Sequence, residues 1–290
     1  SFMSGIFGIF KFLVSSMGMI ISSLMLSVAN ANEGTDYNST NYWDITIPPE
    51  DISVNGHLID WLFNYTTYMN LFFFILVCIG LFGFAYIYHH KKNKKPLYTY
   101  GNKPVHIWTV TIIGIAVFIG IDATISTISN NDLRDVFLDW PEDKEKPLKV
   151  QVMAQQWVWK FRYAGKDEVF NTQDDIVLVN DLRVPINRKL LFQVTSKDVI
   201  HSFFLPNARR KVDAMPGRIS RIWMELNKAG KWPIVCAEMC GTHHYMMGAK
   251  LTTYTPEDFE SWLGQAQRVA METNDPEDLN LYWGWKWEVR

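Results

Sequence analysis

Residues 236–247 read Cys-Ala-Glu-Met-Cys-Gly-Thr-His-His-Tyr-Met-Met, a run that gathers thiol, imidazole and thioether groups within twelve residues. A further histidine, His201, lies 35 residues before Cys236. Soft sulfur ligands combined with imidazole favour copper over harder divalent cations. This stretch therefore predicts a copper site, and the rest of the chain has to supply a scaffold that brings His201 to the cysteines.

The C-x3-C spacing of Cys236 and Cys240 admits three uses: a disulfide, two ligands to zinc, or two thiolates that bridge a pair of metal ions. Zinc sites typically show C-x2-C and a second pair of Cys or His ligands, and a thioether is a poor zinc ligand. A single blue-copper ion would leave one cysteine surplus, and a disulfide would leave the nearby His and Met side chains unexplained.

A dinuclear copper centre gives a use to both cysteines and to the His and Met donors in register with them. Each ion would take both sulfurs and one histidine, either His201 or His244. The Met247 thioether and the backbone carbonyl of Glu238 would then complete the two shells. His243 and Met246 are out of register with this pattern, so His243 is expected to be a neighbour of the site and Met246 a packing residue.

The pattern C-x-E-x-C-G-x-x-H-x-x-M, with His201 upstream, resembles the CuA domain of cytochrome c oxidase subunit II. Three further segments agree with the family: Gln155-Gln-Trp-Val-Trp159 with Q-W-x-W, Asp213-Ala-Met-Pro-Gly-Arg218 with D-A-x-P-G-R, and residues 194–202 with the strand and turn that present the first His ligand. The resemblance spans about residues 57–265. It implies a membrane-anchored all-β protein, in which a two-helix transmembrane hairpin carries a cupredoxin-like Greek-key β-barrel with two copper ions.

The resemblance also implies roles for individual residues. Trp157 would accept the electron from cytochrome c, whereas Trp159 is expected in the core. Glu238 would have a second role, because its carboxylate helps to bind a magnesium ion shared with subunit I. Arg218 resembles residues near the haem propionates. Electrons would pass to haem in subunit I, where oxygen is reduced to water, and subunit III would complete the assembly.

Two apolar runs, residues 68–88 and 105–128, are long enough to span a bilayer of about 30 Å. The basic cluster at 89–95 should stay on the inner side, which places both outer ends, and everything after about residue 129, outside. Asp122 is interpreted as an interfacial acid near the outer end. Residues 5–29, followed by Ala29-Asn-Ala31, indicate a signal peptide or an uncleaved helix. The expected location is a bacterial inner membrane with the copper domain in the periplasm, or alternatively the mitochondrial inner membrane facing the intermembrane space.

We therefore expect four parts: a signal-like segment at 1–31, an outer segment and the hairpin at 32–128, the copper domain at 129–265, and an aromatic tail at 266–290. Short alternating runs predict six to eight strands of a sandwich or barrel; they cover residues 149–153, 157–163, 176–179, 189–195, 218–225 and 250–254. Residues 256–270 predict a helix with Thr255 as N-cap and Pro256 at its first position. The aromatic residues at 281–287 are expected on another subunit, at the membrane interface or on a strand edge.

Two features depart from the family pattern. Val105 stands where many relatives have an acid at the mouth of a proton pathway. The stretch at 160–168 is net basic, where relatives carry acids that attract basic cytochrome c, and the outer part from residue 129 holds 22 Lys and Arg against 23 Asp and Glu. We therefore expect a cytochrome c, or a haem donor that is acidic, membrane-tethered or held in a supercomplex.

The formal net charge of −2 argues against nucleic acid as a partner. A nitric oxide reductase with a similar CuA subunit stays open, as does a membrane-anchored copper-binding protein, although Q-W-x-W speaks against the latter. A quinol oxidase subunit is not expected, because such subunits have lost the copper ligands present here. A nitrous oxide reductase is not expected either, because it would need a large propeller domain.

Overall fold

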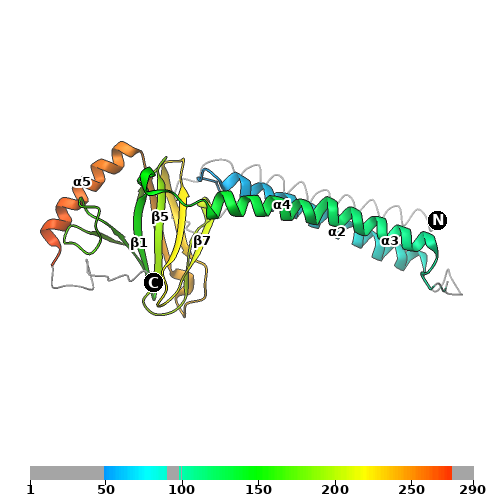
Figure 1. Ribbon diagram of the computed structural model, residues 1–290. Helices are drawn as coiled ribbons and strands as arrows, with labels where there is room; N and C mark the ends of the chain where they lie inside the picture. The colour runs from blue at the N-terminus through cyan, green and yellow to red at the C-terminus, as the bar shows by residue number, and fades with distance from the viewer. Residues whose placement is uncertain (1–48, 90–97, 99, 276–290) are drawn as a thin grey trace. The chain divides into compact units, whose positions relative to one another are not determined.

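The computed structural model describes residues 49–89, 98 and 100–275 (Figure 1). These residues form two compact units, one of residues 54–145 and one of residues 49–53 together with 146–275. The signal-like segment, most of the basic cluster at 89–95 and the aromatic tail at 281–287 lie outside the described residues.

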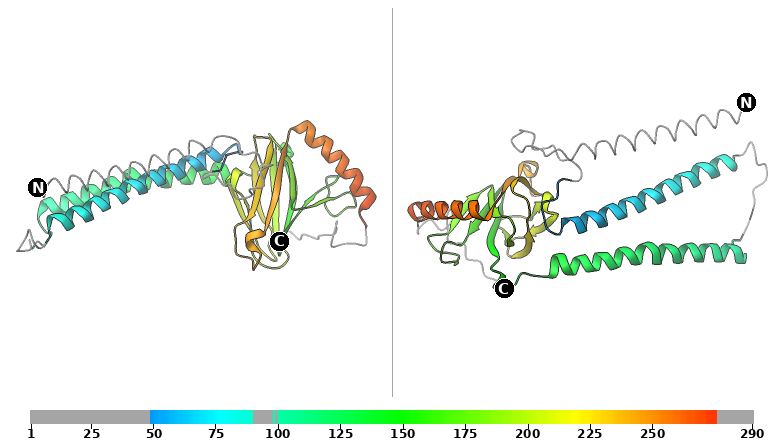
Figure 2. Two further views of the ribbon diagram at one scale, coloured as in Figure 1. Left: turned by 180° about the vertical axis from the view of Figure 1, so that it is seen from behind. Right: turned by 90° about the horizontal axis from the view of Figure 1, so that it is seen from above.

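The first unit consists of two long antiparallel helices (Figure 2). Helix α2 covers Gly56–Ile87, and a second helix runs without a break through α3 Pro104–Val117, the π-helical η2 Phe118–Asp122, α4 Ala123–Asp132 and the π-helical η3 Leu133–Leu138. Both are long and apolar enough to cross a membrane. The Tyr65 hydroxyl donates to the Gly120 carbonyl at 3.3 Å and joins the two helices.

Both helices extend beyond the apolar runs. Helix α2 begins at Gly56 rather than near Tyr68, because polar residues such as Thr66 and Thr67 continue the helix and return their hydroxyls to carbonyls one turn back. Hydropathy detects the part of a helix that suits lipid, not its ends. The second helix likewise continues to Leu138, and Asp122 is exposed within η2.

The second unit is a sandwich of two five-stranded sheets in the orders β3-β2-β1-β5-β8 and β4-β10-β9-β6-β7. The first sheet contains β1 Leu148–Gln155, β2 Val158–Tyr163, β3 Ile176–Val179, β5 Lys189–Ser196 and β8 Ser220–Glu225. The second contains β4 Asp181–Pro185, β6 His201–Leu205, β7 Arg210–Ala214, β9 Gly230–Cys236 and β10 Gly248–Tyr254. Side chains from the inner faces, such as Val152, Phe192, Phe203 and Leu251, form the core.

The expected class, two apolar helices and a cupredoxin-like β domain, is confirmed, but the expected number of strands was too low. All six predicted runs are strands, and β4, β6, β7 and β9 are additional. Strand β9 was missed because Pro233 argues against a central strand. The structure accommodates this proline because β6 pairs with β9 only at Val235 and Cys236. Strand β6 was missed because nearly all of its residues are buried, so it shows no alternation.

Helix α5, Pro256–Thr273, packs against the sandwich (Figure 1). The Thr255 side chain caps it by accepting from the Asp258 amide at 3.2 Å, as predicted. The helix ends at Thr273 rather than at residue 270. Trp262 fixes it to the domain, because its ring lies 5.6 Å from that of Tyr163 and 5.5 Å from the Arg183 guanidinium.

A short segment, residues 49–53, closes the end of the sandwich that lies away from Cys236. Ile52 is fully buried, its amide donates to the Asn207 carbonyl at 3.0 Å, and its carbonyl accepts from the Asn227 amide at 2.9 Å. These bonds join the β6–β7 and β8–β9 connections at this end of the sandwich. The loops at the other end, where Cys236 lies, are not used in this way and can build a site.

Candidate metal centre

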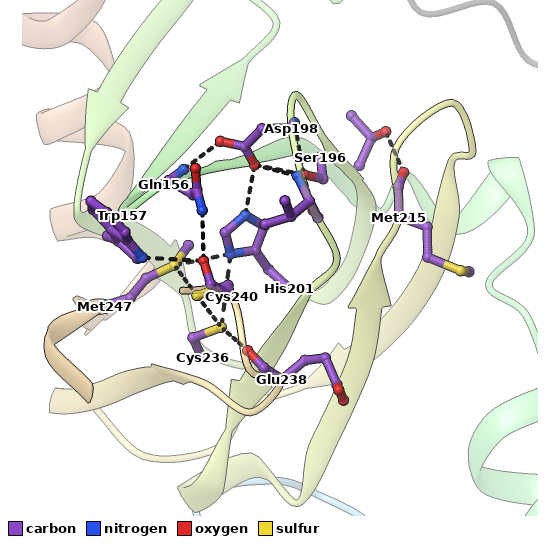
Figure 3. A network of polar contacts seen from close by, with 12 residues as sticks. Gln156, Trp157, Ser196, Asp198, His201, Met215, Cys236, Glu238, Cys240 and Met247 are labelled. Atoms are coloured by element: carbon purple, nitrogen blue, oxygen red, sulfur yellow. Dashed lines mark hydrogen bonds and ion pairs between the residues drawn. The ribbon is translucent and has the colours of Figure 1, made fainter. Parts of the chain in front are cut away.

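Three connections meet at one end of the sandwich: the β1–β2 turn, the β5–β6 turn and the long loop from Ala237 to Met247 between β9 and β10 (Figure 3). Strand pairing brings them together. Phe203 pairs with Cys236 across β6 and β9, and the Ala237 amide donates to the Ser202 carbonyl at 3.0 Å. His201, the first residue of β6, is therefore placed beside the start of the cysteine loop.

The ring nitrogens of His201 and the sulfurs of Cys236 and Cys240 form a buried group, with one atom of each residue within 4.8 Å of the others. The two sulfurs lie 3.8 Å apart, and both thiols are free. His201 Nδ1 lies 3.9 Å from the Cys236 sulfur. His244 Nδ1 lies 3.5 Å from the Cys240 sulfur. The two imidazoles therefore flank the pair of thiols, His201 beside Cys236 and His244 beside Cys240.

The remaining two predicted donors lie at the same cluster. The Met247 sulfur is 3.1 Å from His201 Nδ1 and 3.7 Å from the Cys240 sulfur. The Glu238 carbonyl oxygen is 3.2 Å from the Cys236 sulfur, and its side chain points away from the cluster (Figure 3). The structure thus brings all six sequence-predicted donors together around the two sulfurs.

A carboxylate that the sequence analysis missed orients His201. Asp198 Oδ1 lies 2.9 Å from His201 Nε2, so Nε2 donates to the carboxylate and Nδ1 is the ring nitrogen that faces the sulfurs and would bind a metal. Asp198 is held in turn by the backbone amides of Gln156 and Val199, at 2.7 and 2.6 Å. The D-x-x-H spacing was the available signal, but it acquires meaning only when the turn between β5 and β6 is known.

The charges of the site suit a cation. Burial raises the pKa of the Cys236 thiol, but hydrogen bonds from His201 and the Ser202 backbone outweigh it and lower the pKa to about 6. Burial and the neighbouring Cys236 sulfur raise the pKa of Cys240 to about 12. Burial lowers the pKa of His201, yet Cys236 and Asp198 raise it above its ordinary value. Two thiolates this close repel each other unless a positive charge joins them, so a metal that displaces the remaining protons fits the donor set.

Comparisons with known proteins agree with this geometry. The family profile described as "Cytochrome C oxidase subunit II, periplasmic domain" matches residues 148–253. A probable cytochrome c oxidase subunit 2 of Rickettsia prowazekii is 30% identical over 247 residues, which cover 79% of this chain and 74% of that protein. The chain belongs to the cytochrome c oxidase subunit II family.

Two further proteins are similar to this chain. An alternative cytochrome c oxidase subunit 2 of Bradyrhizobium diazoefficiens is 29% identical over 241 residues, covering 76% of this chain and 84% of that one. A solved periplasmic domain of subunit II of cytochrome oxidase from Bradyrhizobium japonicum is 28% identical and covers 42% of this chain and 94% of its own, with a TM-score of 0.38. The family carries copper, and it is a component of the haem–copper oxidase enzymes.

The family's Q-W-x-W motif begins in the β1–β2 turn beside the cluster, with Gln156 and Trp157, and continues into β2 with Trp159. The Gln156 side-chain amide and the Trp157 indole both donate to the Cys240 carbonyl, at 2.8 and 3.3 Å. Trp159 is fully buried, with its ring 6.2 Å from that of His201, so its assignment to the core is confirmed. Trp157 therefore lies between the surface and the cysteine loop.

The two residues out of register differ in outcome. The expectation that His243 is a neighbour of the site is confirmed, because its ring lies 4.4 Å from the Trp157 ring. The expectation that Met246 packs was wrong, because it is 65% exposed. A single turn of 3-10 helix, His244–Met246, turns Met247 inward and leaves Met246 outside.

The net-basic stretch at 160–168 is less basic at the surface than in the sequence. Arg162 is fully buried, and its guanidinium binds Asp175 at 2.5 Å. The exposed residues of the stretch include one cation and two acids, Lys166, Asp167 and Glu168. The argument for an acidic donor therefore loses much of its support.

Proposed function

We propose that this chain takes single electrons from a c-type cytochrome at a dinuclear copper centre and delivers them to haem in the catalytic subunit, where oxygen is reduced to water. The observation that carries the proposal is the cluster itself. Two buried thiols lie 3.8 Å apart, with His201 Nδ1 3.9 Å from the Cys236 sulfur and His244 Nδ1 3.5 Å from the Cys240 sulfur. A single zinc ion held by two thiolates and two imidazoles would also use these four groups, but it would leave the Met247 thioether, 3.7 Å from the Cys240 sulfur, without a use. Two copper ions that share the sulfurs would use the thioether as well.

The distances favour a particular division of the ligands. Both sulfurs would serve both ions. Met247 lies 3.1 Å from His201 Nδ1, so these two residues would complete one shell. His244 and the Glu238 carbonyl would complete the other. Bound copper would supply the one-electron redox couple.

The protein's own residues then make that couple fast and selective. The donors are fixed by two sheets and by the Asp198 bond to His201, so little rearrangement accompanies a change of charge. Burial of His201, Cys236, Cys240 and Met247 excludes water from the sulfurs. Trp157 would accept the electron at the surface, because its indole is bonded to the Cys240 carbonyl.

The Glu238 side chain supports a second metal assignment. Glu238 is exposed and points away from the cluster, although its carbonyl faces Cys236 (Figure 3). One residue can therefore offer its carbonyl to copper and its carboxylate to a magnesium ion shared with subunit I. This arrangement would couple the copper loop to the surface of the partner.

The proposed setting is a bacterial inner membrane with the copper domain in the periplasm. The two long apolar helices and the match to a periplasmic-domain family support this location; a mitochondrial inner membrane is the alternative. Subunits I and III are the proposed partners in the membrane. The donor would be a cytochrome c, soluble or tethered, that approaches Trp157 over a loop without charged residues from Met239 to Gly248.

The test is an electron paramagnetic resonance spectrum of the purified full-length chain loaded with copper. A seven-line mixed-valence signal with about two coppers per chain supports a dinuclear site built on bridging thiolates. A four-line signal with one copper would refute it. Met247→Leu should perturb the signal, and Met246→Leu, on the exposed neighbour, is the matched control. Activity of the assembled complex with oxygen against nitric oxide then separates an oxidase from a nitric oxide reductase.

A further inference from the structure

The indole of Trp157 is held on three sides by the cysteine loop. Its Nε1 donates to the Cys240 carbonyl at 3.3 Å. One edge of the ring lies against Gly241, where an added Cβ would come within 3.1 Å of the indole carbon Cζ2 and 3.4 Å of Nε1. The third side is the imidazole of His243, with ring centroids 4.4 Å apart and planes inclined by 59°.

His243 differs from the other histidines of the site in its surroundings. His201 is fully buried against the sulfurs, whereas His243 is exposed. Its Nδ1 lies 3.1 Å from the Thr242 hydroxyl, which holds the ring in place beside the indole. The side chain is therefore committed to Trp157 and to its own loop rather than to the sulfur cluster.

We propose that His243 is a positioning residue for electron uptake: its ring keeps the Trp157 indole packed over the Cys240–Gly241 peptide. This inference rests on the proposed function, in which Trp157 takes up the electron. Without the imidazole, one face of the indole is uncovered, and a single hydrogen bond to a carbonyl opposes its rotation into solvent. Electronic coupling falls steeply with distance, so a rotated indole conducts poorly to Cys240.

The strength of an aromatic pair sets the expected effect. Such pairs change the ratio of packed to rotated side chains by a factor of about two to ten. We therefore expect His243→Ala to reduce the second-order rate of electron uptake by up to that factor. His243→Phe keeps a ring and should stay within about twofold of the wild type, whereas His243→Asn keeps polarity without a ring and should resemble the alanine variant.

The first experiment is hydroxyl-radical footprinting of the full-length chain without metal. The Trp157 peptide should be oxidised about two to ten times faster in His243→Ala than in the wild type, and His243→Phe should restore protection. Equal rates in all variants would overturn the proposal. So would equal loss in the Ala and Phe variants, because the ring would then be irrelevant. This readout is independent of copper, so it judges His243 even if the proposed function fails.

The second experiment uses the assembled oxidase and reduced cytochrome c in stopped flow. The expected pattern is slower uptake in His243→Ala, an unchanged copper signal and an unchanged rate from copper to haem. Loss of the copper signal would place His243 in the metal shell and overturn the positioning role. Two other results would instead refute the proposed function. One is a wild type without the seven-line signal, and the other is an equal rate of electron uptake in the wild type and in Trp157→Phe.

Discussion

Replacing Asp198 by asparagine should weaken copper binding about tenfold, because the orientation of His201 depends on this carboxylate. The side chain of His201 is fully buried, and its Nε2 lies 2.9 Å from Asp198 Oδ1. Asparagine keeps the shape but loses the charge. Its amide also turns one acceptor into a donor, which must face either His201 or the Gln156 amide, and both of these groups are donors.

The size of the effect follows from the exposure of the carboxylate. Removing a carboxylate partner of a metal-binding histidine typically costs about tenfold to a hundredfold in metal affinity. The Asp198 side chain is 27% exposed, so solvent screens part of its field. We therefore expect a value near the lower end of this range, about 1.4 kcal/mol.

The assay is a competition titration of the full-length protein against a chromophoric copper chelator. Asp213→Asn is the matched control, because Asp213 is exposed and accepts a hydrogen bond from Ser202 at 2.8 Å rather than from a histidine. It should bind copper within about twofold of the wild type. Wild-type affinity in Asp198→Asn, or equal losses in both variants, would refute the role given to this carboxylate.

Three other variants or titrations test the packing and charge of the domain. Gly241→Ala would hold a non-glycine residue at φ +119°, with its Cβ 3.0 Å from a neighbouring side chain. It should lower the free energy of unfolding by about 1–3 kcal/mol. Gly264→Ala is the control, because the space around Gly264 is open, and it should not lower the melting temperature. Asp175→Asn should lower the free energy of unfolding, measured in urea, by about 3–5 kcal/mol, because the buried Arg162 cation would lose its carboxylate. A loss below about 1 kcal/mol would contradict this. In the metal-free protein, the thiolate absorbance of Cys236 should rise near pH 6 and that of Cys240 only above pH 9. Since this folded pKa lies below the ordinary 9.0, the thiol adds stability that is complete above pH 9 and is lost as the pH falls to about 6; a single rise near pH 9 would contradict the assignment.

The sequence alone determined those parts of this protein whose signal is local. A thiol pair at C-x3-C with His244 and Met247 following at fixed offsets lies on one short loop, so its chemistry can be inferred without knowing the fold. Apolar runs located the two helices, and alternation located β5, whose residues are buried in turn along its whole length. The helix cap at Thr255 was equally local.

Only the tertiary structure decided which distant groups meet. Asp198 became the partner of His201, and Gln156 and Trp157 became partners of the Cys240 carbonyl, because strand pairing brings three separate turns to one end of the sandwich. The tertiary structure also buries Arg162 beside Asp175, so this cation does not contribute to the charge of the surface. Such contacts depend on register between strands far apart in the chain, and no short window of sequence carries that register.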